Sequence, residues 1–514
     1  MRAMSVRVLS KLLFAGLAGG GLAVSAAGPP ESPIPQWGCF EAAVENSTTH
    51  HDPYRDVALE TTWTRPDGTT IRFWGFYDGG TTWRIRVMAD QVGTWHYEAK
   101  FSDGRPAVQG SFRCVASDLP GMISTEVGNP MWFGYRSGRH VLVRALHVGD
   151  RFFAANWPAE KRTAFLDWAV GQGYNTLSIA SHYLNRNAEG RGQGWDTPQL
   201  WPLDAREYRA MEKILDDLAR RRILVFPFAG FFGQSSNYPR HPADQELYVR
   251  YTLARLAPYW NLLWNVAGPE PNAGRGWMAR ADVERLGRLI KRCDPFGHLI
   301  SVHNRTGDDP YRDSDWTTYG ILQGPKTLDR QALGEGLLRN HHPAKPLLAQ
   351  ETLWSGNVNH IRKNGRDYSD DDLRKNAFVI QMSAAALVFA DNEGDSSSGF
   401  SGTLELSQRR QERHDVIRRV WDFFETVPFY RMKPRQDLVD RGFCLAEEGK
   451  EYLAYLETGG RVNVSLKPGN YSVQWINPRR TSEVIQAGTT TDGQGLAAPA
   501  EGVDWLLRLA AGAE

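Results

Sequence analysis

The sequence contains 514 residues, of which 41% are hydrophobic, 11% aromatic and 23% charged, and 60 basic against 59 acidic side chains give a formal net charge of +1. This length corresponds to about three domains, and the apolar content excludes a disordered chain. The balanced charge argues against a protein built around nucleic acid, which carries a basic excess. With 18 tryptophans, as many as tyrosines, the composition favours an enzyme or binding protein with aromatic surfaces.

The N-terminus has the pattern of a secretory signal peptide. Three basic residues precede an apolar stretch at 12–24, and the small residues 25–27 follow as a cleavage site. The apolar stretch is shorter than the ~20 residues that a membrane span needs. We therefore expect residues 1–27 to be removed, with no membrane insertion and a mature chain exported to the periplasm or the extracellular space.

Export permits disulfide bonds, and the sequence has four cysteines. Cys39 and Cys114 lie near the two ends of the first β-rich region, which leaves a bridge between them open. Cys293 and Cys444 are expected to be small buried residues. No cysteine spacing indicates a zinc site.

Residues 35–118 consist of short β-prone segments separated by turn signals such as Pro66-Asp67-Gly68. Several short strands at regular spacing predict an N-terminal β-sandwich. The expected strands are 57–63, 71–77, 83–87, 93–97 and 110–114.

Residues 120–432 change to strands that alternate with helical stretches. Apolar side chains at helical spacing, among them Tyr208, Met211 and Leu215, predict helices between most of the strands. The short polar connection between the fifth and sixth strands gives weak support for a helix. Eight such units predict a (β/α)8 TIM barrel. The expected strands are 140–146, 173–180, 223–228, 262–267, 298–302, 316–322, 346–350 and 384–390.

Residues 437–512 return to strands and predict a small C-terminal β-sandwich. Segments 452–456 and 462–466 flank a Gly459-Gly460 turn and predict a hairpin, and 471–476 predicts a further strand. The predicted fold class is therefore multidomain α/β, a TIM barrel flanked by N-terminal and C-terminal β-sandwich domains.

Two acidic residues stand where apolar barrel strands end. Glu270 follows the fourth expected strand and Glu351 follows the seventh. The reactive residues of a TIM barrel come from these strand ends, and glycoside hydrolysis needs two carboxyl groups, one to protonate the leaving oxygen and one to attack or to activate water. The alternative is that each glutamate caps a helix or pairs with an arginine.

The barrel resembles clan A glycoside hydrolases, and within them the apiosidase-like group. The segments that carry the resemblance are Trp264 to Glu270 and Lys345 to Trp354. The resemblance implies that Glu270 is the general acid/base and Glu351 the nucleophile. Most of the clan has Asn before the acid/base glutamate, where it binds the sugar 2-hydroxyl, whereas this chain has Pro269. Either another side chain such as Asn272 takes that place or the sugar is unusual.

The flanking regions resemble known companions of such barrels. The first is similar to an N-terminal domain of unknown function found before glycosidase barrels, on segments 75–79, 83–86 and 93–95. The last is similar to the domain labelled collagen-binding that ends many apiosidase-like proteins, on segments 455–456 and 475–479. Nothing in these residues indicates collagen.

Polar and aromatic side chains after the other strands are candidates for sugar contacts, because hydroxyls need amides, imidazoles and carboxylates and sugar faces need rings. Each could instead pack a loop. No metal site and no cofactor are expected. The candidates for substrate binding are His147, His182, Tyr183, Asn185, Asn272, His303, Asn304, Gln323, Trp354, Asn357 and Glu393.

The expected activity is cleavage of glycosidic bonds in a polysaccharide or oligosaccharide by retaining double displacement. The expected partner is a glycan, and the sequence makes no prediction of the oligomeric state. Two alternatives remain. A polysaccharide lyase would use a base such as His182, Tyr183 or His303. A non-catalytic carbohydrate-binding protein would be a barrel that has lost its activity.

Overall fold

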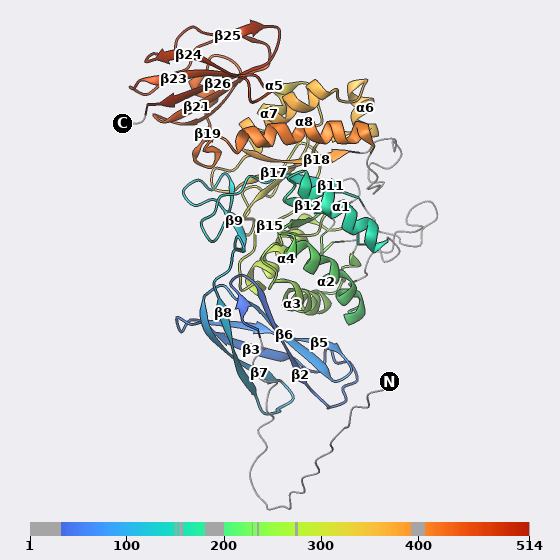
Figure 1. Cartoon of the computed structure of the whole chain (residues 1–514). Coiled ribbons are helices and arrows are strands. Elements are labelled where there is room, and N and C mark those ends of the chain that lie inside the picture. The colour runs from blue at the N-terminus through green and yellow to red at the C-terminus, as the bar shows by residue number, and fades with distance from the viewer. Residues whose placement is uncertain are drawn as a thin grey trace, which may run out of the picture.

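The computed structural model describes residues 32–149, 152–153, 158–179, 200–228, 230–233, 236–272, 276–391 and 407–512. β-sheets at the two ends of the molecule enclose a central part of parallel strands and helices (Figure 1). The expected signal peptide at 1–27 lies outside the described residues. Within those residues, no helix has the length and apolar character needed to cross a bilayer.

The N-terminal part contains two sheets that share an aromatic core. The five-stranded sheet has the order β1-β8-β7-β3-β4 and the three-stranded sheet the order β2-β6-β5. Phe40 of one sheet stacks on Phe112 of the other, with 4.0 Å between ring centroids. Four of the five expected strands are present, whereas the expected strand 71–77 is divided into β4 and β5, which belong to different sheets. The sequence missed β1 and β2. The bounds are β1 Ile34–Pro35, β2 Cys39–Glu45, β3 Leu59–Thr64, β4 Thr70–Trp74, β5 Phe76–Gly79, β6 Thr82–Met88, β7 Gly93–Phe101 and β8 Val108–Val115.

The two cysteines of this part are both free thiols. Cys39 begins β2 and pairs in register with Met88, whereas Cys114 pairs with Ile34 and Gly93 in the other sheet. The bridge that the sequence left open is therefore not formed.

The central part is built on parallel strands. Six of them form a sheet in the order β13-β12-β11-β18-β17-β16, and β14 and β15 form a parallel pair. Isolated parallel bridges, Val225↔Leu262 and Thr306↔Gln323, connect that pair with β13 and β16. All eight expected strands are present. Their bounds are β11 Ala145–Val148, β12 Thr176–Ile179, β13 Leu224–Pro227, β14 Trp264–Asn265, β15 Ile300–Ser301, β16 Gly320–Gln323, β17 Leu347–Ser355 and β18 Ala385–Asp391.

Helices separate most of these strands. In α2, Tyr208, Met211, Leu215 and Leu218 are buried at helical spacing, and the Asp204 side chain caps the N-terminus by accepting from the Arg206 amide. No helix occurs between β15 and β16, where the described chain is continuous. The bounds are α1 Ala159–Gly171, α2 Ala205–Arg220, α3 Pro242–Leu256, α4 Arg280–Cys293, α5 Arg330–Asn340, α6 Val358–Asn364, α7 Asp370–Met382 and α8 Gln408–Phe424.

A short connection, β9 (Ile123–Thr125) and β10 (Phe133–Tyr135), joins the first part to the centre, and the C-terminal part follows. Its sheets have the orders β19-β20-β21-β26-β23-β24 and β22-β25. The bounds are β19 Lys433–Pro434, β20 Phe443–Glu447, β21 Glu451–Leu456, β22 Gly459–Val462, β23 Tyr471–Ile476, β24 Val484–Thr490, β25 Leu496–Glu501 and β26 Trp505–Ala511.

The expected hairpin of 452–456 with 462–466 is wrong. β21 is buried along its whole length and pairs on both edges, with β20 and β26. A strand with two partners has no free edge for the segment that follows it. The chain therefore turns at Gly459 and places β22 beside β25 in the second sheet.

Buried charges hold both end parts against the central helices. Arg255 of α3 is completely buried and bonds Glu212 of α2 at 2.6 Å and Asp78 of β5 at 2.9 Å. At the other end, Asp504 accepts from Arg374 of α7 and from Tyr455 of β21. Each buried charge thus has an opposite partner, as burial of ions requires.

Candidate functional site

The two predicted catalytic glutamates share an unusual backbone conformation. Glu270 and Glu351 have φ values of 49° and 50°, in the left-handed region that residues other than glycine rarely adopt. Glu351 also lies in the interval from Ala349 to Leu353 where the β17–β18 register shifts. Such strain and such irregular strands concentrate at functional sites, which makes these two positions candidates on structural grounds.

The carboxylate of Glu351 is buried and held by polar side chains. Its residue is 3% exposed, Gln323 donates from Nε2 to Oε2, and His303 Nε2 lies 3.3 Å from the same oxygen. Burial alone would raise the pKa of Glu351, but the positive charge of Lys326 and the interaction with His303 outweigh it and lower the pKa to about 2. Glu351 is therefore ionised at neutral pH.

His303 also positions Glu270. The Glu270 amide donates to the His303 carbonyl at 2.8 Å, and the His303 amide donates to Asn265 Oδ1 at 2.8 Å. Asn265 is the last residue of β14, so its side chain and the His303 backbone connect the end of β14 with the segment that follows β15. The Glu270 carboxylate is partly exposed and bonds none of the described residues, which leaves it accessible to a ligand.

His147 lies near Glu351 at the end of β11. Its Nδ1 is 2.9 Å from Ser178 Oγ and accepts from Gln350 Nε2 at 3.1 Å. Burial lowers the pKa of His147 to about 4, against the opposing attraction of Glu351. The imidazole is therefore neutral at pH 7. A neutral imidazole donates a hydrogen bond from one ring nitrogen and accepts one at the other.

Trp354 forms a wall beside this histidine. The residue is completely buried, its ring centroid lies 5.2 Å from that of His147, and the Lys326 ammonium lies 5.7 Å from the ring. The tryptophan, which its sequence position made a candidate for contact with a sugar, thus packs within the site. Its contact with a sugar stays a prediction.

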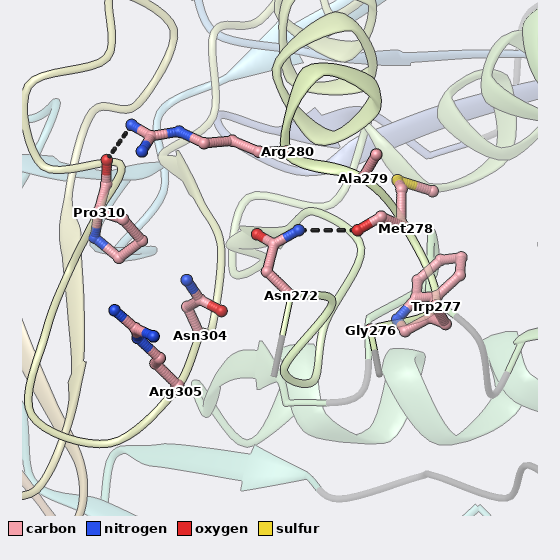
Figure 2. Close-up of a pocket in the computed structure, with 9 residues that line it drawn as sticks. All are labelled: Asn272, Gly276, Trp277, Met278, Ala279, Arg280, Asn304, Arg305 and Pro310. Carbon is pink, nitrogen blue, oxygen red and sulfur yellow. Dashed lines mark hydrogen bonds between the residues drawn. The ribbon is translucent and has the colours of Figure 1, made fainter. Parts of the chain in front are cut away.

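Asn272 and Asn304 line one cavity of about 610 Å³ in the loops after β14 and β15 (Figure 2). Asn272 donates to the Met278 carbonyl at 2.7 Å and accepts from the Tyr311 hydroxyl, so its amide is bonded to protein on both sides. Asn304 is 3% exposed, and its Oδ1 has no hydrogen-bond partner among the described residues. Of the two, Asn304 has the greater capacity to bind a ligand hydroxyl.

The remaining candidates have different positions. Asn357 is the N-cap of α6, and its Oδ1 accepts from the amides of Asn359 and His360. This bonding supports the helix, and its role toward a substrate stays a prediction. His182, Tyr183, Asn185 and Glu393 lie outside the described residues. In the part of the chain that is described, no group of three or more His, Cys, Asp or Glu side chains could hold a metal ion.

Sequence reasoning missed three side chains of this site. Ser178 and Gln350 both contact His147, and each lies inside a strand, where the search for residues after strand ends did not look. Lys326 follows β16 by three residues and provides positive charge near Glu351. A basic residue just after a parallel strand is the signal that could have indicated it.

One family model matches the N-terminal part of the chain. Residues 33–102 match the family model "Domain of unknown function (DUF5060)", which agrees with the resemblance inferred for the N-terminal part. No curated protein matches the chain in sequence.

Solved structures show a similar fold. A Bacteroides vulgatus protein described as a "putative glycoside hydrolase" matches with a TM-score of 0.73 and 17% identity, over 94% of this chain and 100% of its own. A structure described as "Glycoside hydrolase" gives 0.57 and 12% over 77% of this chain and 99% of its own. A glycoside hydrolase family 5 protein from B. vulgatus gives 0.55 and 13%, over 77% and 95%. This chain therefore shares its fold, over 94% of its residues, with the first of these structures.

Proposed function

We propose that the chain is an exported glycoside hydrolase that cleaves glycosidic bonds in a polysaccharide or oligosaccharide with retention of configuration. The observation that carries the proposal is the ionised, buried Glu351, whose Oε2 is held by Gln323 and His303 while His303 also fixes the backbone of Glu270. The shared fold with structures described as glycoside hydrolases supports the same conclusion.

In the proposed reaction, Glu351 attacks the anomeric carbon while Glu270 donates its proton to the leaving oxygen. The C–O bond to the leaving sugar breaks, and a covalent glycosyl-enzyme forms. Glu270, now a carboxylate, takes a proton from water, whose oxygen attacks the anomeric carbon and releases Glu351. Retention requires the two carboxyl groups about 5–5.5 Å apart. The contacts to Oε2 leave Oε1 of Glu351 for the attack.

The architecture that we propose for this enzyme is a (β/α)8 barrel at 120–432, between a β-sandwich at 35–118 and one at 437–512, after a cleaved signal peptide at 1–27. The eight parallel strands and their intervening helices support the barrel. Membership of the apiosidase-like group of clan A belongs to the same proposal, on the segments around the two glutamates.

The test is a screen of the purified protein against plant, algal and bacterial glycans, with Glu351→Ala as the control. New reducing ends that this control does not release support hydrolysis, and the first anomer detected by proton NMR distinguishes retention from inversion. Products that absorb in the ultraviolet as unsaturated sugars would indicate a lyase. Binding without turnover by the unmodified protein would indicate a non-catalytic carbohydrate-binding protein.

A further inference from the structure

The cavity in the loops after β14 and β15 contains two arginines that the proposed reaction does not use. Its lining includes Asn272, Trp277, Arg280, Asn304, Arg305 and Pro310. Asn272 comes two residues after Glu270, and Asn304 comes directly after His303, whose carbonyl bonds the Glu270 amide. The cavity is thus continuous in the chain with the proposed acid/base. A sugar that leaves from the protonated oxygen would lie on this side of the bond that breaks.

The two arginines carry charge that the protein leaves largely unneutralised. Arg280 donates to the Pro310 carbonyl at 2.7 Å, as Figure 2 shows, and its guanidinium lies 5.4 Å from the Tyr311 ring. Among the described residues, no carboxylate oxygen lies within 4 Å of Arg280. Arg305 has one weak partner, Asp308 at 3.6 Å. Both guanidiniums keep donors available for a ligand.

The N-terminus of α4 adds positive potential at the same place. The helix begins at Arg280 after Ala279, and no side chain caps its first turn. Uncapped amides and the helix dipole attract negative charge. The acid in that turn, Asp282, is exposed and bonds Arg285, and it is not part of the cavity lining.

Two buried polar atoms indicate that the cavity is shaped for a sugar and not only for an ion. Asn304 Oδ1 and Trp277 Nε1 are both buried and have no hydrogen-bond partner among the described residues. A buried polar atom without a partner costs free energy. Sugar hydroxyls can donate to an amide oxygen and can accept from an indole N–H. The Trp277 ring offers an apolar face for the sugar ring.

We propose that this cavity binds the leaving-group side of the substrate, and that the sugar bound there carries a carboxylate or a sulfate group that Arg280 and Arg305 recognise. The substrate would therefore be an acidic glycan. The inference rests on the proposed glycosidase function for the position of the sugar, but the recognition of the acidic group can be measured without catalysis.

The experiment is isothermal titration calorimetry of the full-length mature protein carrying Glu351→Ala, which removes turnover. The probes are a set of uronic acid oligosaccharides, the same oligosaccharides as methyl esters, and sulfated oligosaccharides. We expect at least one acidic probe to bind about tenfold or more tightly than its uncharged counterpart, because charge-assisted hydrogen bonds from arginine are strong. A preference for carboxylate or for sulfate identifies the acidic group.

Arg305→Gln should remove about tenfold or more of that preference. The control is Arg288→Gln on α4, because Arg288 is an exposed arginine that pairs with Asp315 and does not line the cavity. The proposal is overturned if no probe shows a charge preference, or if both variants change it equally. Charge-dependent binding by a protein that hydrolyses no glycan would instead overturn the proposed activity alone.

Discussion

The imidazole Nε2 of His303 lies 3.3 Å from Oε2 of Glu351, and both residues are almost completely buried. The backbone carbonyl of the same histidine accepts from the amide of Glu270. His303, which follows β15, therefore contacts both glutamates that the proposed mechanism uses. Its ring contacts the nucleophile Glu351, and its backbone carbonyl contacts the acid/base Glu270. The ring contact can be changed by mutation while the backbone contact remains.

Replacement of His303 by Ala should shift the acid limb of the pH profile upward. The pKa of Glu351 is about 2, below its ordinary value of 4.5, because Lys326 and His303 outweigh burial. Loss of His303 removes part of the stabilisation of the carboxylate, so its pKa rises, and activity is lost at a higher pH when the solution is acidified. We expect the acid limb of the kcat/KM profile to move up by about one pH unit.

The control for this shift is His342→Ala, because His342 is partly exposed and bonds the Ala344 amide away from the site. The control profile should match that of the unmodified protein. An unchanged acid limb in His303→Ala, together with a normal melting temperature, would show that the contact does not tune Glu351.

Removal of the two glutamates should have different effects on substrates with different leaving groups. Glu351→Ala should abolish turnover of every substrate, because the covalent intermediate cannot form. Glu270→Ala should lower kcat/KM by about 10²–10⁴ on a natural glycan, and far less on a dinitrophenyl glycoside, whose leaving group needs no proton. Steady-state kinetics on both substrates measures this difference, and equal losses on both would contradict the assignment of Glu270 as the acid.

Gln323→Ala tests the other contact of the nucleophile. Gln323 Nε2 donates to Glu351 Oε2, and Gln323 Oε1 accepts from Thr306 Oγ1 at 2.8 Å. Without the amide the carboxylate loses a positioning partner, and we expect kcat to fall about tenfold or more. Gln323→Glu should be worse, since it places a second negative charge beside Glu351. Activity of Gln323→Glu equal to that of the unmodified protein would mean that the contact has no role.

The sequence indicated several of the residues that the structure brings together, because the search was directed at the ends of the expected parallel strands. Glu270 and His303 follow strands, Gln323 is the last residue of β16, and Glu351 lies within β17 at its register shift. The structure brings His303, Gln323 and Glu351 together. A search limited to residues after strand ends does not select Ser178 and Gln350, which lie within strands and contact His147. The strand order of the C-terminal part could not be predicted from the sequence either. The pairing of β21 with β26 joins segments about fifty residues apart, and such a pairing leaves no local sequence pattern.

The buried network between the N-terminal sheets and the central helices should determine stability. Arg255→Met would leave Glu212 and Asp78 without the guanidinium that bonds both of them in the interior. We expect a loss of about 1.5–3 kcal/mol in the free energy of unfolding, because each carboxylate loses one buried charge-assisted partner while Arg86 still bonds Glu212 and Arg84 still bonds Asp78. Arg206→Met on the neighbouring helix α2 is the matched control, since Arg206 is 82% exposed and pairs with Asp204 at the surface. Denaturant titration should show little change for this control.

The same network predicts how that difference depends on pH. Burial tends to raise the pKa of Glu212, but its bonds to Arg255 and Arg86 outweigh burial, and the pKa lies below its ordinary value. A carboxyl group with a lowered pKa in the folded state stabilises the protein above its ordinary pKa and loses that contribution as the pH falls through the lowered one. The unfolding free energies of the unmodified protein and of Arg255→Met should therefore converge in acid. A difference that stays constant from neutral to acid pH would show that Arg255 acts through packing and not through charge.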